Sequence, residues 1–267
     1  MEYTGQLKKM QATLEDEVRY HLPIGEELID MNQYINKEIS LIYHHKIECL
    51  KCGRETVKSF NQGFCYPCFK AAPEAADWII HPEKSQAHLG IEDRDLAYEE
   101  SVQLKPHVVY LSLTSGMKVG VTRNTQVPTR WIDQGAVKAI KLAETPNRYL
   151  AGMIEVSLKN HMADKTNWRK MLMNLYPDVD LIEKKNSTKL LLDEAYHQYI
   201  SKTDEIIAIN FPVTEYPIKI KSIGFDKVPE YNGILKGIKG QYWMLDGDRV
   251  INMRKYSGYH LNVETPE

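Results

Sequence analysis

The sequence predicts an α+β protein in which β-rich ends enclose a cysteine-rich segment and a compact module of strands and helices. Three observations support this class: alternating apolar stretches at both ends, four cysteines in two C-x2-C pairs, and a central strand–turn–strand pattern followed by helical periodicity. A chain of 267 residues with 43% hydrophobic content is long enough for two or three such units. The predicted parts are a β-rich segment 1–46, a cysteine-rich segment 47–70, an acidic linker or helical segment 71–104, a module 105–176, and a helix with a β-rich segment 177–267.

The two ends of the chain carry the strand patterns. Stretches such as "VRYHLPIG" near the N-terminus and "IIAINFPV" near the C-terminus are short, apolar and alternating. Because neither set has an obvious helix to cover it, we expect segments 1–46 and 177–267 to pair with each other into one barrel or sandwich. Within the second segment, residues 187–202 are expected to form a helix capped by Ser187.

The four cysteines are the most specific signal in the sequence. Cys49, Cys52, Cys65 and Cys68 form two C-x2-C pairs separated by twelve residues, which predicts a zinc ribbon over residues 47–70. Disulfides are the competing interpretation, but nothing in the sequence places the chain in an oxidising compartment. A site closed by four thiolates has no open position for a substrate, so we expect the zinc to be structural.

Charge is distributed unevenly along the chain. Residues 81–100 are acidic and typical of a linker, whereas residues 105–170 carry eleven lysines and arginines against four acids. A local excess of seven positive charges, in a chain whose net charge is −2, indicates a footprint for a polyanion such as DNA or RNA. The alternative is a solvated basic face without a partner.

Several classes of protein are disfavoured by the pattern. No run approaches the roughly 18 consecutive apolar residues of a membrane span, and the N-terminal stretch lacks the apolar core of a secretory signal. No G-x-G-x-x-G follows a strand and no Walker loop is present, so no organic cofactor is expected. These features predict a cytoplasmic protein without a membrane partner.

The string "HVVYLSLTSGMKVGVTR" at residues 107–123 predicts a β-hairpin. If residues 114–116 form a three-residue loop with Gly116 left-handed, one face of the hairpin is wholly apolar and the other is mainly polar. Gly120 then lies directly opposite Tyr110. The missing side chain leaves a shallow slot that fits either a ligand backbone or the phenol ring itself.

Short motifs in this region resemble the GIY-YIG nuclease superfamily. The strings "VVY" at 108–110 and "KVG" at 118–120 stand where the two half-motifs would be. Arg130 in "PTRW" and Glu155 in "RYLAGMIEVSLK" stand near the superfamily's arginine and its metal-binding glutamate. This resemblance covers about residues 106–172. Over most of the chain, strings such as "KVGVTR", "RWIDQGA" and "DKTNWRKML" resemble a bacterial zinc-ribbon family with a domain of unknown function.

The resemblance implies a small antiparallel sheet with helices that cleaves a phosphodiester using one magnesium or manganese ion. In this interpretation Glu155 holds the divalent cation, Tyr110 orders or deprotonates the attacking water, and Arg130 neutralises charge on the phosphorus. The superfamily has a tyrosine where this chain has Lys118, which can still grip a phosphate. The residues implied to be catalytic are Tyr110, Lys118, Arg130 and Glu155, and those implied to bind nucleic acid are Lys118, Gly120, Arg123, Arg130 and Arg169.

Each of these residues also has a purely structural interpretation. Tyr110 is compatible with an ordinary strand aromatic, Arg130 with a local ion pair, and Glu155 with a solvated helix position. Trp131 and Trp168 are most simply core residues, although either could stack a base if exposed. Two functions remain open: a metal-dependent nuclease with a structural zinc ribbon, and a zinc-ribbon module that binds DNA or RNA without catalysis. The retained tyrosine, arginine and glutamate favour the first, and the lysine in place of a tyrosine favours the second.

Overall fold

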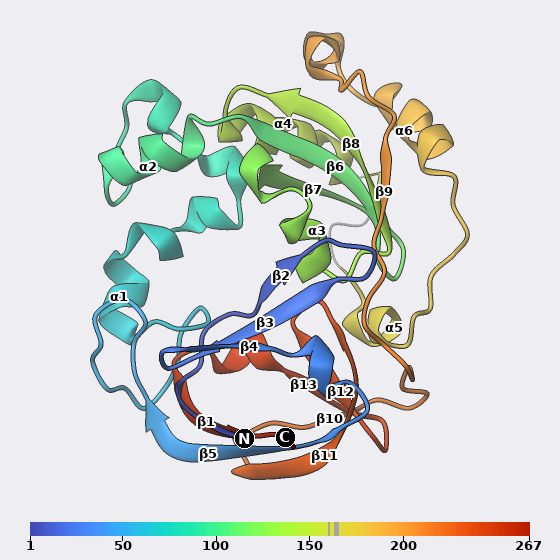
Figure 1. Ribbon diagram of the computed structural model, residues 1–267. Helices are drawn as coiled ribbons and strands as arrows, with labels where there is room; N and C mark the ends of the chain where they lie inside the picture. The colour runs from blue at the N-terminus through green and yellow to red at the C-terminus, as the bar shows by residue number, and fades with distance from the viewer. Residues whose placement is uncertain (160, 163–165) are drawn as a thin grey trace. The chain divides into compact units, whose positions relative to one another are not determined.

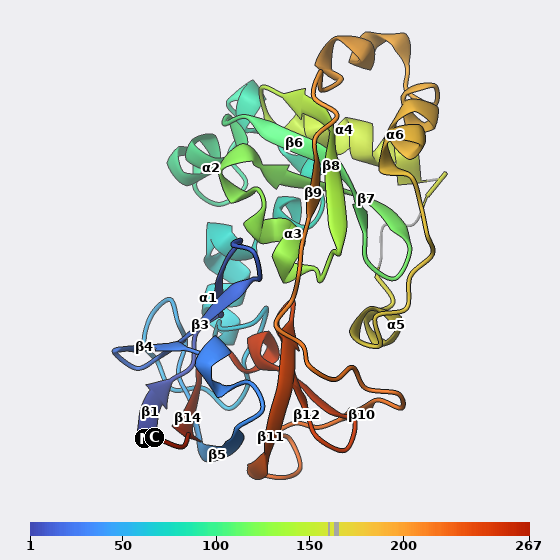
Figure 2. The same ribbon diagram turned by 45° about the vertical axis from the view of Figure 1, so that its right-hand side comes forward.

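The computed structural model describes residues 1–159, 161–162 and 166–267. By its internal contacts the chain divides into two units, Met1–Lys70 with Asn210–Glu267, and Ala71–Ile209. The first unit therefore combines both ends of the chain, and the second is inserted between them in the sequence (Figures 1 and 2). The finer division into five parts stays a prediction. None of the helices in the described part of the chain has the length and apolar character that a membrane crossing needs.

Strands from both ends of the chain share one sheet in the first unit. Over the described residues this sheet has seven strands in the order β1-β14-β5-β11-β12-β13-β10. β1 pairs antiparallel with β14, and the α-amino group of Met1 donates a hydrogen bond to the carbonyl of Thr265, so the termini lie together (Figure 1). The strands of this unit are β1 (Glu2–Gln6), β2 (Gln11–Thr13), β3 (Arg19–Ile24), β4 (Glu27–Asp30), β5 (Glu38–Ile47), β10 (Lys221–Ser222), β11 (Glu230–Lys239), β12 (Tyr242–Leu245), β13 (Arg249–Asn252) and β14 (Tyr259–Glu264).

The ends do not close into the barrel that was one expectation. β1 and β10 are the two edges of the larger sheet, and β2, β3 and β4 form a separate three-stranded sheet. One physical reason is the length of β10, which has only two residues and offers little backbone to continue a ladder. β14 still contributes to the core of this unit, because Leu261 and Val263 are fully buried, although Asn262 between them is buried too.

A buried lysine lies at the end of β11. Lys239 is fully enclosed, and its Nζ lies 5.3 Å from the ring centre of Phe211 and 5.4 Å from that of Tyr216. Burial lowers the pKa of Lys239 from 10.5 to about 7. The folded state therefore disfavours the charged amine that the unfolded chain carries at neutral pH.

Replacing Lys239 with methionine is expected to remove a pH-dependent destabilisation of the protein, because the amine whose pKa is lowered by burial is no longer present. Between the folded pKa of about 7 and the ordinary value of 10.5, the unfolded wild type binds more protons than the folded one. Wild-type stability should therefore rise with pH across this window relative to the variant. Urea unfolding at about pH 6, 8 and 9.5 measures the difference, and a gain that is independent of pH would contradict the assignment.

The second unit is built on a sheet with the order β7-β6-β8-β9, four strands within the described ranges. The predicted hairpin register is confirmed, with Tyr110 opposite Gly120 and Leu113 opposite Met117. α4 covers one face of the sheet, where its apolar residues join the core (Figure 2). The elements are α2 (Leu96–Gln103), β6 (His107–Leu113), β7 (Met117–Arg123), α3 (Thr129–Asp133), β8 (Lys138–Thr145), α4 (Arg148–Lys159), α5 (Trp168–Leu172), α6 (Leu181–Lys189) and β9 (Ile206–Ala208), and α1 (Tyr66–Ala71) ends at the start of this unit.

The hairpin loop differs from the prediction at Gly116, which is not left-handed. The amide of Thr114 donates to the carbonyl of Gly116 at 3.1 Å and closes the turn. The hydroxyl of Ser115 accepts a hydrogen bond from the amide of Asn167 at 2.9 Å. Backbone closure and this contact to a distant residue therefore hold the loop without a left-handed glycine.

The helix expected over residues 187–202 is also wrong. α6 spans Leu181–Lys189, and residues Glu194–Tyr199 form a separate 3₁₀ turn. The cap is Asp180, whose carboxylate accepts hydrogen bonds from two backbone amides of the first turn. Ser187 instead lies inside the helix and donates to a carbonyl one turn earlier.

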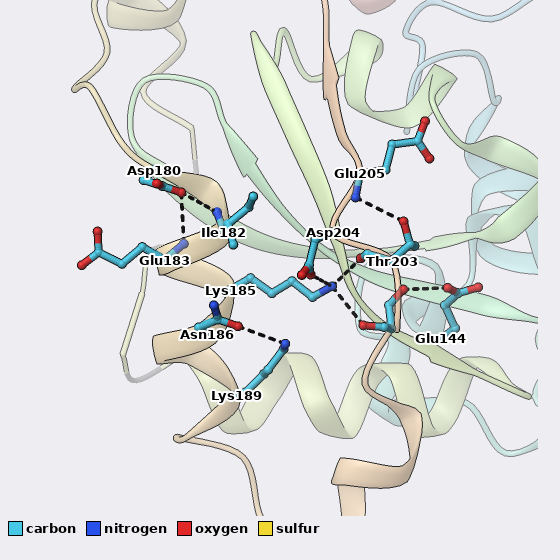
Figure 3. A network of polar contacts seen from close by, with 11 residues as sticks. Glu144, Asp180, Ile182, Glu183, Lys185, Asn186, Lys189, Thr203, Asp204 and Glu205 are labelled. Carbon is cyan, nitrogen blue, oxygen red and sulfur yellow. Dashed lines mark hydrogen bonds and ion pairs between the residues drawn. The ribbon is translucent and has the colours of Figure 1, made fainter.

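A buried lysine holds α6 against the sheet of this unit (Figure 3). Lys185 is fully enclosed, and its Nζ donates to the carbonyls of Ser201 at 3.0 Å and Thr203 at 2.5 Å. It also donates to Oδ1 of Asp204 at 2.9 Å. The hydroxyl of Ser201 donates to the carboxylate of Glu144 on β8. These contacts position the chain just before it adds β9 to the edge of the sheet.

Candidate metal centre and polar cluster

Four cysteines of the first unit meet at one point. The Sγ atoms of Cys49, Cys52, Cys65 and Cys68 all lie within 4.8 Å of one another, and those of Cys52 and Cys65 are 3.8 Å apart. Four sulfurs about 2.3 Å from a zinc ion have the same separation of about 3.8 Å along a tetrahedron's edge. All four cysteines are free, so the disulfide interpretation is wrong. The first turn depends on Gly53, which is left-handed and donates its amide to the carbonyl of Cys49.

The four thiols of this cluster do not all lose their protons easily at the same time. Burial raises the pKa of Cys49, but hydrogen bonds from the backbone of Cys65, Cys52 and Lys51 outweigh it and lower that pKa to about 6. The hydrogen bond with Cys52 and burial raise the pKa of Cys68 to about 12. One thiolate therefore forms easily and opposes the next. A divalent cation relieves this repulsion, and the four cysteines could bind a metal ion such as zinc.

A second group of candidate functional residues lies in the inserted unit. Tyr110 comes from β6, Lys118 from β7, Arg130 from α3 and Glu155 from α4. The charges of Arg130 and Glu155 act on the pKa of the Tyr110 hydroxyl, and the charge of Lys118 acts on the pKa of Glu155. We call these four residues the polar cluster. The structure therefore brings together all four residues that the sequence singled out as catalytic candidates.

Tyr110 is completely enclosed within this cluster. Its hydroxyl donates a hydrogen bond to Oε1 of Gln134 at 2.8 Å, and the centre of its ring lies 5.7 Å from that of Trp131. Burial raises the pKa of Tyr110 to about 12, although Arg130 and Gln134 act to lower it. The phenol therefore stays protonated at neutral pH and can act as a hydrogen-bond donor. Its partner Gln134 follows α3 directly, and no sequence pattern pointed to it.

Gly120 makes room for the tyrosine opposite it. A Cβ at this position would lie 2.6 Å from Oη and 2.7 Å from Cζ of Tyr110. Of the two occupants considered for the slot, the ring of Tyr110 is the one present. The glycine is therefore explained by packing within the hairpin.

Glu155 is mostly buried at the edge of α4. Its side chain is 12% exposed and lies 3.8 Å from Nζ of Lys159. Burial raises the pKa of Glu155, Lys159 lowers it, Glu83 raises it and Arg148 lowers it. Arg148 lies two helical turns before Glu155, a spacing that could have identified it from the sequence. Glu83 belongs to the segment that the sequence indicated as a linker, so nothing local could have identified it.

This linker-like segment lies against α4. Among the 3₁₀ turns of residues 71–104 are η3 (Asp77–Ile79) and η4 (Pro82–Lys84), and η4 packs closely against α4. We call residues 77–84 the docked segment. A Cβ at Gly152 would overlap the amide nitrogen of Glu83. The space that Gly152 leaves on the surface of α4, one turn before Glu155, is therefore filled by the backbone of Glu83.

Gly152→Ala is expected to displace the docked segment and to lower the free energy of unfolding by about 2–4 kcal/mol. The added Cβ would meet the backbone of Pro82 and Glu83, which cannot yield without moving the whole turn. Urea unfolding measures the loss, with Val156→Ala at an exposed position of the same helix as the control. Equal stability of the two variants would contradict the tight contact.

Two further candidates for nucleic-acid binding, Arg123 and Arg169, are not part of the polar cluster. Arg123 ends β7, is partly exposed, and its charge acts on the pKa of Arg148. Arg169 is exposed on α5, with its guanidinium 4.3 Å from the ring centre of Trp168. Trp131 is only 1% exposed, so it is a core residue and cannot stack a base.

Some of the basic side chains in residues 105–170 are buried or held by the protein rather than free on its surface. Lys118 and Arg148 are buried, and Nζ of Lys138 donates to a backbone carbonyl at 2.6 Å. Lys165 and Asp164, which contribute to the charge count of this segment, lie outside the described residues. The basic surface available to a polyanion is therefore smaller than the sequence count indicates.

The family comparison covers both sites. The family model described as "Protein of unknown function (DUF2797)" matches residues 36–261, a range that includes the four cysteines and the polar cluster. The comparisons with curated proteins and with solved structures gave no match. The chain belongs to the DUF2797 family of proteins of unknown function.

Proposed function

We propose that this protein is a metal-dependent enzyme that cleaves phosphodiester bonds in DNA or RNA and carries a structural zinc ribbon. The observation behind the proposal is the convergence of Tyr110, Arg130 and Glu155 from three different elements. A phenol, a guanidinium and a carboxylate in one largely buried cluster are suited to phosphodiester hydrolysis. The resemblance of residues 106–172 to GIY-YIG nucleases supports the same reaction class.

The environment of each residue suggests its role. Glu155 would hold magnesium or manganese, an ion that accepts one or two carboxylates and keeps several waters. When bound, such an ion neutralises phosphate charge and acidifies water. Arg130 would neutralise the phosphate oxygens, and the charge of the buried Lys118 would act on Glu155 rather than on the phosphate. Tyr110 donates its only hydroxyl proton to Gln134 and has a pKa of about 12, so it would orient the attacking water by accepting a hydrogen bond rather than act as a base.

A second function is favoured by one observation, the complete enclosure of Tyr110. Its hydroxyl already has a protein partner in Gln134, and its ring fills the space above Gly120. If this arrangement persists with nucleic acid bound, the phenol does not reach a substrate. The protein would then be a zinc-ribbon module that binds DNA or RNA without cleaving it.

A cleavage assay separates the two functions. Zinc-loaded protein is incubated with supercoiled plasmid, single-stranded DNA and structured RNA, with Mg²⁺, with Mn²⁺, or with neither ion. Cleavage that requires the added ion supports the enzyme. Binding without cleavage under every condition supports the binding module, and the absence of both binding and cleavage rejects both functions.

Binding should depend steeply on salt, because each phosphate contact releases counterions. Arg123→Ala and Arg169→Ala are each expected to reduce the slope of log affinity against log salt by about one. Lys202→Ala, at an exposed position outside residues 105–170, is the matched control and should leave the slope unchanged. Fluorescence anisotropy with a labelled oligonucleotide measures the slopes, and equal slopes for all three variants would reject the basic footprint.

A further inference from the structure

The docked segment brings a second acid to the face of α4 that carries Glu155. Gly152 and Glu155 are three positions apart on α4, so they lie on one face of the helix, one turn from each other. The backbone of Glu83 lies directly against Gly152, where any side chain would overlap it. Glu83 therefore approaches the Glu155 face from outside the helix.

Arg148 anchors the docked segment on the same helix. It is about nine-tenths buried, and its guanidinium donates to the carbonyls of Trp78 at 3.1 Å and Ile79 at 2.6 Å. The guanidinium also lies 5.7 Å from the ring centre of Trp78. Two charge-assisted hydrogen bonds and a cation–π contact restrain the backbone a few residues before Glu83.

The carboxylate of Glu83 is only partly satisfied by the protein. Its side chain is 25% exposed, and Oε1 lies 3.4 Å from Nδ1 of His81. Oε2 is buried and has no hydrogen-bond partner among the residues that the structure describes. A buried carboxylate oxygen without a partner costs free energy, and a nearby cation would offset that cost.

The charges around Glu155 come from several elements. Burial is the largest cause of its raised pKa, and the negative charge of Glu83 raises it further. Two carboxylates in a poorly solvated place repel each other unless a proton or a cation neutralises them. The other charged or titratable groups that act with Glu155 are Lys159 and Arg148 on α4, Lys118 on β7 and Tyr110 on β6.

We propose that Glu83 is a positioning residue for Glu155: the charge that the docked segment places beside Glu155 strengthens its hold on a divalent cation such as Mg²⁺ or Mn²⁺. The proposal rests on the proposed function, because the same cation is involved. It assigns a role to a residue that lies outside the segment resembling GIY-YIG nucleases. It also gives a reason for docking the segment so tightly at Gly152.

The first test follows the protonation of Glu155 directly. Carbon-13 NMR of the glutamate side-chain carboxyls, with Glu155→Gln to assign the signal, gives the pH midpoint of Glu155. Glu83→Gln should lower this midpoint by about half a unit or more, since removing a neighbouring negative charge eases ionisation. Glu100→Gln, an exposed acid on α2, is the control. An unchanged midpoint in Glu83→Gln overturns the proposal.

The second test measures the affinity for Mn²⁺ of zinc-loaded protein, by electron paramagnetic resonance of the free ion. Glu83→Gln should weaken binding about tenfold, the scale of one lost charge interaction, Glu83→Asp should restore part of the affinity, and Glu100→Gln should not alter it. Equal affinity of wild type and Glu83→Gln overturns the proposal, even if the wild type cleaves nucleic acid. A tenfold loss in a protein that cleaves nothing supports the proposal and refutes the nuclease function. Absence of Mn²⁺ binding by the wild type overturns both.

Discussion

Glu155→Gln is expected to reduce cation-dependent cleavage by about a hundredfold or more, the scale of removing a catalytic charge. The fold should not suffer, because the attraction of Lys159, Arg148 and Lys118 does not outweigh the cost of burying this carboxylate, and the side chain is not part of the apolar core. The pKa of Glu155 is raised in the folded state, so its ionised form opposes folding above the ordinary value of 4.5. The neutral amide should therefore be at least as stable as wild type at pH 7.

The assay for this variant pairs activity with stability on one preparation. Cleavage of plasmid and RNA in Mg²⁺ and Mn²⁺ is compared with urea unfolding and zinc content, and Glu100→Gln again serves as the control. Loss of cleavage with full stability assigns Glu155 to the chemistry. A variant that cleaves as fast as wild type would refute the role of Glu155 as the holder of the cation.

Cys65→Ser is expected to abolish zinc binding and to destabilise the first unit severely. Structural zinc sites contribute apparent binding free energies of about 10–16 kcal/mol in small domains, much of it as folding energy. Cys65 is only 2% exposed, so its loss also leaves a polar hydroxyl beside three uncompensated thiols. We expect a loss of several kcal/mol in the free energy of unfolding, with low solubility.

Elemental analysis and thermal unfolding check this prediction. The wild type should contain about one zinc per chain, and a strong chelator should lower its stability toward that of Cys65→Ser. Cys68→Ser, at a less buried ligand, is the matched comparison and should lose zinc with a smaller direct packing cost. A wild type that contains no zinc, or that is indifferent to the chelator, would refute the metal centre.

The hairpin and the cysteine cluster could be predicted because both depend on short-range patterns. Alternating faces allowed one register that buries Leu111 and Val119 together, and the structure has that register. The C-x2-C spacing similarly determines two local turns, and Gly53 supplies the left-handed residue after the first of them. The predictions of a left-handed Gly116 and of a helix cap at Ser187 were wrong, because other nearby groups close the loop and cap the helix. Closure of the loop backbone replaced the first, and the carboxylate of Asp180 replaced the second.

The sequence by itself determined the strand faces, the cysteine spacing, and the presence of a tyrosine, an arginine and a glutamate on three different elements. Only the tertiary structure decided that Tyr110 is enclosed and that the docked segment reaches α4. Arg148 and Trp78 are 70 residues apart, and Glu83 meets Gly152 through backbone contact. Such contacts depend on how well two surfaces fit together, and the segments that form these surfaces are far apart in the sequence. A lone glycine in a helix pattern does not say which backbone will use the space it leaves.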